Sequence, residues 1–428
     1  MANPSTTNPA PLRLVLLITF FGSMGTAVIT NGLSFIADQG LGYSGTQNLL
    51  LALVLGAAYI PAALLSAPIQ RRLTTTTPLT TRHLLLLMML LLTAIAQVPM
   101  LAQWINPAWT EVALWTLGIG YMILVGMLWP IVEGYLSGGR SGKPLRNAIG
   151  KFNIVWSASM VLAYWLMAPL IESSPFLIIA LLGSVHIFIA AVVYKLPDEP
   201  AAHLTENHQP HNPTPPVYRP LLNVFRVMLI ASYIILSAII PLMPSTQARL
   251  GLDELWWTPI ASTWLIVRVL FFFLFERWHG WHGRWWTPWF GMSTMLIGFA
   301  LSMGSPMLGS SATETIQETV NLLGVLTLVG GLALMGIGIA AIYYGALYYA
   351  MAVGGSDVDS GGKHEALIGV GYTAGPLCGL IGAALSTDNT LGVIGLTTLV
   401  VLTMVAIAAY KAPQSKRPPK VKAPPNPK

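Results

Sequence analysis

Residues 196–218, LPDEPAAHLTENHQPHNPTPPVY, form the longest polar and proline-rich stretch of the chain. Such a composition is typical of a linker and cannot build a packed element. Six apolar runs precede this stretch and six follow it. The runs lie near residues 12–36, 46–69, 83–102, 111–137, 147–171, 174–195, 219–243, 256–275, 285–304, 320–350, 364–386 and 389–410.

Each run is long enough to cross a bilayer, because about 20 helical residues span about 30 Å of hydrocarbon. The chain is 54% hydrophobic and 9% charged, whereas soluble domains carry about 25% charged residues. The sequence therefore predicts an all-α membrane protein with twelve transmembrane helices in two six-helix bundles. The predicted divisions are a tail at 1–11, a bundle at 12–195, the linker at 196–218, a bundle at 219–410 and a basic, disordered tail at 411–428.

The charges fix the orientation of the predicted helices. If the N-terminus is cytoplasmic, the cytoplasmic loops and tails hold nearly all the lysines and arginines, and Arg249 is the one basic residue of the outer loops. This asymmetry follows the positive-inside rule. We therefore expect a multi-pass protein of the cell (inner) membrane with both termini cytoplasmic. The net charge of +6 then faces anionic lipid, and we expect no nucleic-acid partner.

A short repeat links the two halves. Residues 146–150 (RNAIG) and residues 365–369 (EALIG) each follow a glycine-rich loop, and each opens the fifth run of its half. Repeated halves are common in secondary transporters. In the second half, the run also carries a Gly-x-x-x-Gly-Pro-x-x-Gly pattern at 371–379, which predicts close helix approach and a kink.

Twelve runs, halved by a cytoplasmic linker, resemble the major facilitator superfamily over residues 12–410. The family's motif between helices 2 and 3 is degenerate here, since residues 66–73 read SAPIQRRL with Gln70 at the acidic position. Its second-half counterpart, ERWHGWHGR at 276–284, keeps more of the charges. The resemblance implies a secondary transporter that works by alternating access. It also implies a cytoplasmic gate that relies on Glu276, Arg277 and Arg284.

Ionisable residues inside the runs are the best pointers to function, because an unpaired charge in the membrane is costly. Arg268 is the deepest charge, and we expect it to hold an anionic or polar group of the substrate, or else to reach a helix end. Glu133 is a candidate for proton coupling, or for a gate pair with Arg226, Lys151 or Arg146. Glu365 is a further candidate for coupling, although it also suits a helix N-terminus.

Polar and aromatic residues inside the runs are candidates for a binding pocket, with packing as the alternative. Two tyrosine pairs, 343–344 and 348–349, lie in the tenth run. Residues three or four apart share one helical face. Asn153 and Trp156 therefore share a face, and so do Tyr344 and Tyr348. The predicted substrate-binding residues besides Arg268 are Asn31, Asn153, Trp156, Tyr233, Tyr344 and Tyr348.

The sequence holds no enzyme signature, and we expect no catalytic residue and no cofactor. Histidines of the linker and of the loop at 278–284 could bind metal, but no ligand spacing appears inside the runs, so we predict no metal site. Cys378 is the lone cysteine, which excludes a disulfide within the chain. We expect a monomer that moves a small solute. The alternatives are a non-transporting receptor or scaffold on the same fold and, less favoured, a membrane-embedded transferase.

Overall fold

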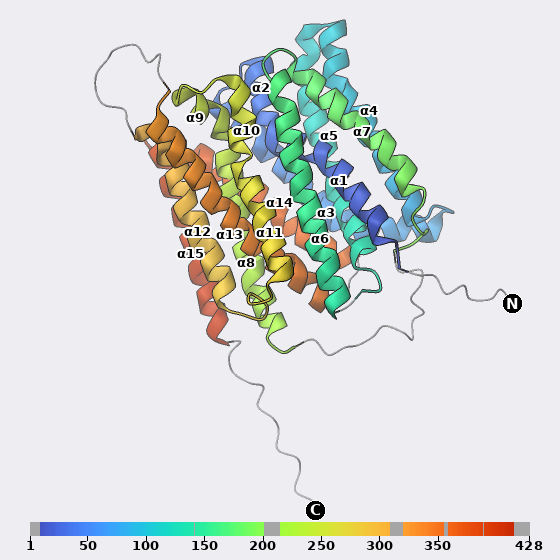
Figure 1. Ribbon diagram of the computed structural model, residues 1–428. Coiled ribbons are helices and arrows are strands. Elements are labelled where there is room, and N and C mark those ends of the chain that lie inside the picture. Colours follow the sequence, from blue (N-terminus) through green and yellow to red (C-terminus); the bar gives the residue numbers. More distant parts are fainter. Residues whose placement is uncertain are drawn as a thin grey trace, which may run out of the picture.

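The computed structural model describes residues 9–140, 142–200, 215–308, 320–354, 358–387 and 389–414. The first half contains α1 (Leu12–Ala27), the π-helical turn η1 (Val28–Gly32), α2 (Leu33–Leu41), α3 (Gly45–Thr76), α4 (Thr81–Ile105), η2 (Pro107–Trp109), α5 (Thr110–Ser137), α6 (Gly142–Met167), η3 (Ala168–Leu170) and α7 (Pro175–Val193). The second half contains α8 (Tyr218–Ile239), η4 (Ile240–Leu242), α9 (Met243–Arg249), η5 (Glu254–Trp256), α10 (Trp257–Ala261), α11 (Thr263–Arg277), α12 (Trp286–Gly304), η6 (Ser305–Met307), α13 (Leu322–Gly354), α14 (Val358–Leu385) and α15 (Asn389–Gln414). The two halves stand side by side, and α6 lies next to α11 (Figure 1).

The helices confirm the predicted spans. Eleven helical segments of the described residues are long and apolar enough to cross a bilayer. The remaining predicted run, 285–304, is α12, a helix of 19 residues that packs along α13. The chain is therefore an all-helical, multi-pass membrane protein. The first residues of α1 and the last residues of α15 lie toward the same side of the bundle (Figure 1).

Two helices extend beyond the predicted runs. The first span continues past residue 36 to Leu41, with a π-helical turn in its middle. Residues 411–414 of the predicted tail belong to α15, because the helix still packs on the bundle at Ala412, which is 8% exposed. Residues 415–428, and residues 201–214 of the predicted linker, lie outside the described part of the chain.

Side-chain caps fix where two of the long helices begin. Ser44 and Gln47 form a capping box at the start of α3, and Thr80 and His83 form one at the start of α4. Such caps satisfy backbone N–H groups that have no partner within the helix. The first residues of the predicted linker are tied to the same end of α4. Asp198 pairs with Arg82 at 2.7 Å, and the Thr81 backbone N–H donates to Glu199 Oε1 at 2.9 Å.

The two halves meet mainly through α3 and α14, and small residues let their backbones approach. A Cβ atom on Gly56 of α3 would lie 2.6 Å from the Tyr372 carbonyl of α14, and one on Gly362 would lie 2.7 Å from the Ala63 oxygen. The Gly-Pro pattern of α14 packs α14 against α8 in the same way. A Cβ on Gly371 would lie 2.3 Å from Tyr233 Cβ, and one on Gly375 would lie 2.4 Å from the Ile234 oxygen. The predicted close approach at this pattern is confirmed.

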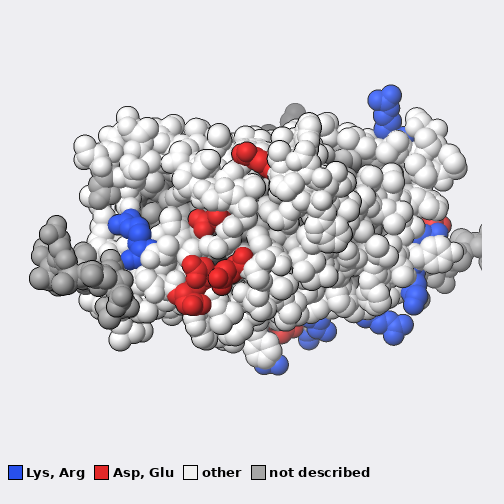
Figure 2. All heavy atoms as spheres, turned by 90° about the horizontal axis from the view of Figure 1, so that it is seen from above, with Lys and Arg blue, Asp and Glu red and all other residues white. Residues whose placement is uncertain are grey.

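Acidic side chains gather on the face that carries the loops predicted to lie outside. Figure 2 looks onto this face and shows Asp and Glu over its middle, with Lys and Arg mostly at its edges. Glu111 and Glu172, from two of these loops, are exposed. This distribution agrees with the charge asymmetry of the sequence.

Candidate functional site

A cavity lies between the two halves, and we call it the central cavity. The space between atoms there, counted together with the part that is open to solvent, is about 460 Å³. The first half contributes Thr26, Thr30, Tyr59, Trp129, Phe152, Trp156 and Met160 to its wall. The second half contributes Tyr233, Tyr343, Glu365, Ile368 and Tyr372. The wall therefore combines helices from both halves, and aromatic rings dominate it.

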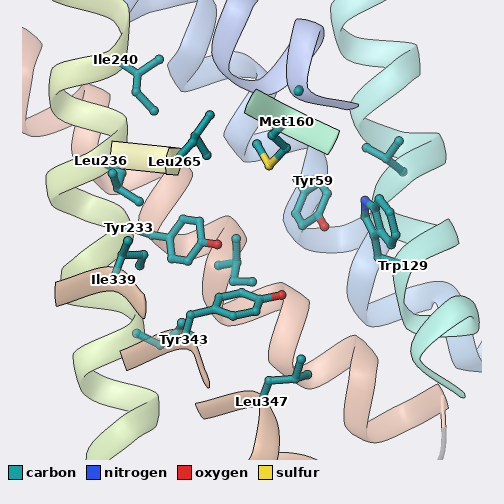
Figure 3. Packing of buried hydrophobic residues seen from close by; sticks show 14 of the residues in the cluster. Tyr59, Trp129, Met160, Tyr233, Leu236, Ile240, Leu265, Ile339, Tyr343 and Leu347 are labelled. Atoms are coloured by element: carbon teal, nitrogen blue, oxygen red, sulfur yellow. The ribbon is translucent and has the colours of Figure 1, made fainter. Parts of the chain in front are cut away.

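The side chains of the wall converge on a common space. Figure 3 shows the hydroxyl groups of Tyr59, Tyr233 and Tyr343 pointing inward, with Trp129 on the far side and Met160 above them. Pockets of this kind, apolar with a few convergent polar groups, are typical of small-molecule sites.

Two carboxylates and an imidazole meet at the edge of this cavity. The ligand atoms of Glu133, His364 and Glu365 all lie within 4.8 Å of one another. These side chains are only 1%, 3% and 5% exposed. Glu133 comes from α5, whereas His364 and Glu365 come from α14, so the fold joins the halves here. We call these three residues the acid cluster.

Few partners satisfy the acid cluster within the described part of the chain. The Tyr59 hydroxyl donates a hydrogen bond to Glu365 Oε2. The carboxyl groups of Glu133 and Glu365 lie close enough to share a hydrogen bond when one is protonated. Apart from that contact, the described residues give neither oxygen of Glu133 nor Nε2 of His364 a hydrogen-bond partner. Gly361 allows the close approach, because a Cβ there would lie 2.7 Å from Glu133 Oε2. Two carboxylates this close, buried and without a cationic partner, do not both stay ionised, since like charges in a low dielectric repel strongly.

The donor types of the acid cluster also occur at divalent metal sites. One observation disfavours a metal ion here: the Arg226 guanidinium is close enough to His364 to act on it electrostatically. A positive charge beside the cluster raises the energy of a bound dication far more than that of a shared proton. The absence of a metal site stays a prediction.

Arg268 of α11 lies beside the central cavity and behind its wall. Its guanidinium is 4.2 Å from the ring centre of Trp156 and 4.6 Å from that of Trp264. Nη2 also lies 3.3 Å from the sulfur of Met160. The side chain is 1% exposed. The ion pairs of the described residues join Arg82 to Asp198 and Lys363 to Asp359, and none includes Arg268. Stacking on tryptophan faces partly compensates such a charge.

Only some of the other predicted binding residues line the central cavity. Trp156 and Tyr233 line the central cavity. Asn153 is fully buried near it, and neither end of its amide has a partner among the described residues. Tyr344 and Tyr348 lie outside the cavity wall and pack against Trp281, at ring-centre distances of 5.0 and 5.7 Å.

Asn31 lines a second cavity, which we call the outer cavity. Its polar wall residues are Thr30, Asn31, Ser34, Asn48, Ser237 and Tyr372. Thr30 and Tyr372 belong to the walls of both cavities. Thr30 and Asn31 sit in the π-helical turn, where the Tyr164 hydroxyl donates to the Asn31 carbonyl at 3.0 Å. Such turns are frequent at functional sites.

Sequence reasoning missed several residues of the central cavity, chiefly Tyr59, Trp129, Met160 and Tyr372. A signal existed for Tyr372, which adjoins Gly371 of the Gly-Pro pattern in the middle of a span. Tyr59 stands three residues after Gly56 in α3, so both fall on one face. The other two residues carry no local signal that separates them from lipid-facing neighbours.

The predicted gate residues lie at the other end of α11. Glu276 packs on Gly150 of α6, where a Cβ would lie 2.6 Å from Glu276 Cγ. The Arg277 guanidinium stacks 3.6 Å from the ring centre of Phe273. Neither side chain takes part in an ion pair within the described part of the chain. The contact between halves at this point is thus one of packing.

A ring cluster beside this contact makes stability depend on pH. His282 contacts Tyr218 at 3.1 Å and Tyr348 at a ring-centre distance of 4.8 Å. Burial, followed by the charges of Arg146 and His279, lowers the pKa of His282 to about 4. Because its folded pKa lies below the ordinary value of about 6.5, the neutral ring stabilises the fold above that pH, and this contribution is lost as the pH falls from about 6.5 to 4.

We therefore expect the melting temperature of the purified protein to fall between pH 7 and pH 5, and to fall less in the His282→Gln variant. The exposed His279→Gln variant is the control and should keep most of the drop. Thermal unfolding followed by intrinsic fluorescence at several pH values tests this. An identical drop in the wild type and in His282→Gln would contradict it.

Comparisons with known proteins place the fold. No family model matches the sequence, and no curated protein matches it significantly. Solved structures do resemble it. A bacterial homologue of the human lysosomal transporter Spinster, inward-facing and unoccupied, superposes with a TM-score of 0.60 at 14% identity, over 95% of this chain and 96% of that one. The human organic anion transporter MFSD10 gives 0.59 at 14% over 92% and 99%. The nucleoside transporter NupG gives 0.58 at 14% over 95% and 99%. The likeness confirms the predicted fold.

Proposed function

We propose that this chain, which has the fold of the major facilitator superfamily, is a secondary transporter that moves a small solute by alternating access. The observation that carries the proposal is the central cavity, whose wall comes from both halves and whose edge holds the buried acid cluster. The halves contact each other on both sides of it. On one side Ser34 Oγ donates to the Ile240 oxygen at 3.3 Å and Thr258 Oγ1 donates to the Tyr164 oxygen at 2.8 Å.

On the other side, Gly361 packs on Pro130 and Gly362 packs on Ala63. A site enclosed between two rigid bundles can open to either side when the bundles rock. In the proposed cycle, Glu276 and Arg277 belong to the cytoplasmic contact that must separate. Arg268 attracts the anionic or polar end of the solute, and Trp156 and Tyr233 contact its body. Asn31 lies on the outer approach, and Asn153, Tyr344 and Tyr348 support the walls.

The acid cluster supplies proton coupling in this proposal. A proton held between Glu133 and Glu365 neutralises one of two adjacent negative charges, so its gain or loss changes the electrostatic cost of closing the cavity. The groups that face the pair come from every helix around it. They are Tyr59 of α3, Arg226 and Tyr233 of α8, Tyr343 of α13, and His364 and Tyr372 of α14.

The proposal places the protein in the cell (inner) membrane with both termini cytoplasmic, acting as a monomer without enzymatic activity or a cofactor.

One observation favours the receptor or scaffold alternative. Gln70 stands where the family has an acid, and its amide donates to Thr81 Oγ1 at 2.7 Å. A hydrogen bond of this kind stands in place of the charge network that, by the resemblance to the family, holds the inner gate shut.

The test is transport by the purified full chain in liposomes. The panel contains monocarboxylates, primary amines, zwitterionic amino acids, hexoses and nucleosides. We expect at least one class to accumulate when the lumen is alkaline, with matching alkalinisation outside or acidification inside reported by a pH-sensitive dye. Binding of a solute without flux would favour the receptor alternative. The absence of flux and binding across the panel would overturn the proposal.

A further inference from the structure

The central cavity carries opposite charges at its two ends. Glu365 is the one carboxylate in the described wall, with Glu133 behind it. Arg268 lies at the other end, behind Trp156 and Met160. No ion pair joins the ends, but the phenol groups of Tyr233, Tyr343 and Tyr372 each lie within electrostatic range of both Arg268 and Glu365. An electric field therefore crosses the cavity.

The space between the charges is bounded by rings from both halves. Trp156 of α6 stacks on Tyr343 of α13 at 5.0 Å between ring centres and 22° between planes. Tyr372 meets Tyr59 at 5.9 Å and Tyr233 at 5.2 Å, both edge to face. Walls of this kind favour a ring-bearing ligand, because ring pairs gain energy beyond the area that they bury.

We propose that the ligand of the central cavity is a ring-bearing zwitterion. Its anionic group faces Arg268, its protonated amine faces Glu365, and its ring lies between the tyrosines. The inference rests on the proposed transport function and names the substrate class of the same site. A ligand with one charge would compensate one end of the cavity and leave the other buried charge without a partner, which costs binding energy.

The side chains at each end suit these roles. The flexible thioether of Met160 separates the Arg268 guanidinium from the cavity, and methionine changes rotamer readily. Arg268 then presents a planar, charged donor to a carboxylate. At the other end Glu365 faces the cavity, while Glu133 lies behind it and has Glu365 as its partner. One carboxylate of the pair therefore binds the amine while the other holds the proton.

The test uses four probes of similar size. They are 4-(aminomethyl)benzoate, which is zwitterionic, 4-methylbenzoate, which is an anion, 4-methylbenzylamine, which is a cation, and ring-free 6-aminohexanoate. Binding of each radiolabelled probe to the purified full chain is measured at equilibrium. We expect 4-(aminomethyl)benzoate to bind at least about tenfold more tightly than either singly charged probe, as one charged hydrogen bond allows. We also expect it to bind more tightly than 6-aminohexanoate.

Two variants test which side chain binds each charged group of the zwitterion. In Glu365→Gln, the advantage of the zwitterion over 4-methylbenzoate should disappear. In Arg268→Gln, its advantage over 4-methylbenzylamine should disappear. The exposed Glu172→Gln and Arg219→Gln variants are matched controls and should keep the wild-type order. If Arg268→Gln does not fold, Arg268→Lys keeps the charge and should keep the order, and Glu365→Gln still decides the other end.

Three outcomes would overturn the inference: a singly charged probe that binds the wild type as tightly as the zwitterion, variants that weaken all probes equally, or 6-aminohexanoate that binds as well as the ring-bearing zwitterion. Flux of hexoses or of ring-free monocarboxylates without zwitterion binding would overturn the inference and leave the transporter proposal standing. The absence of any flux would instead count against the transporter proposal.

Discussion

Replacement of Glu133 by glutamine is expected to abolish proton-driven accumulation of the transported solute while leaving exchange of solute for solute in place. A pH difference of two units can drive about a 100-fold accumulation per proton, because each unit is worth about 1.4 kcal/mol. Glutamine cannot take up or release a proton, so the accumulation ratio of the variant should fall to about one. Exchange needs no net proton movement and should continue.

The measurement is accumulation and counterflow in liposomes, using the best solute of the panel. Glu365→Gln should also lose accumulation, since the two carboxylates act as a pair, and its exchange should weaken because Glu365 also faces the amine of the solute. Glu172→Gln is the matched control, because Glu172 is an exposed acid away from the cavity. Full accumulation by both Glu365→Gln and Glu133→Gln would refute proton coupling through the acid cluster. Loss of exchange in Glu133→Gln would point to a role of Glu133 in solute binding.

Replacement of Gly56 by valine is expected to stop transport and to lower stability. A Cβ at this position would lie 2.6 Å from the carbonyl carbon and oxygen of Tyr372. These are backbone atoms of the partner helix, which cannot turn aside as a side chain can. Helices α3 and α14 would have to separate, at a cost of about 1–3 kcal/mol by the usual effect of overpacking. The separation would also move Tyr59 away from Glu365.

Gly330→Val is the matched control, because Gly330 lies in a transmembrane helix where a Cβ would meet nothing within 4 Å. Melting temperature and exchange rate are measured for both variants. We expect Gly56→Val to have a lower melting temperature and no exchange. We expect Gly330→Val to keep the wild-type melting temperature and exchange rate. Normal exchange in Gly56→Val would show that the contact between α3 and α14 is dispensable for the cycle.

The helices could be predicted from the sequence because the bilayer constrains length and polarity so strongly. A run of about 20 apolar residues has few alternatives to a helix in lipid. The π-helical turn at Val28–Gly32 has no such signature, since it depends on the Tyr164 hydroxyl that reaches a carbonyl from another helix. The extension of α15 beyond residue 410 likewise depends on packing at Ala412.

The site was only partly predictable. Arg268, Glu133 and Glu365 stand out in the sequence because they are charges in apolar runs. Their arrangement does not, because Glu133 and Glu365 lie in different halves and meet only after the bundles dock.

The rotation of α13 about its axis decides which of its tyrosines face the central cavity. Adjacent residues of a helix point about 100° apart, since 3.6 residues make a turn. Tyr343 therefore lines the cavity while its neighbour Tyr344 packs on Trp281. A sequence shows the pair but not which member faces inward.

The side chains between the two cavities determine whether a solute moves between the cavities faster than the bundles rock. Thr30 and Tyr372 are common to both walls, so a single layer of side chains separates them. Side chains change rotamer far faster than whole bundles move, which takes microseconds to milliseconds. A solute in the outer cavity would thus exchange with the central cavity many times before the bundles rock once. Competing solutes would then reach binding equilibrium in the central cavity before each rocking step. The slow step would carry whichever solute occupies the cavity at that equilibrium.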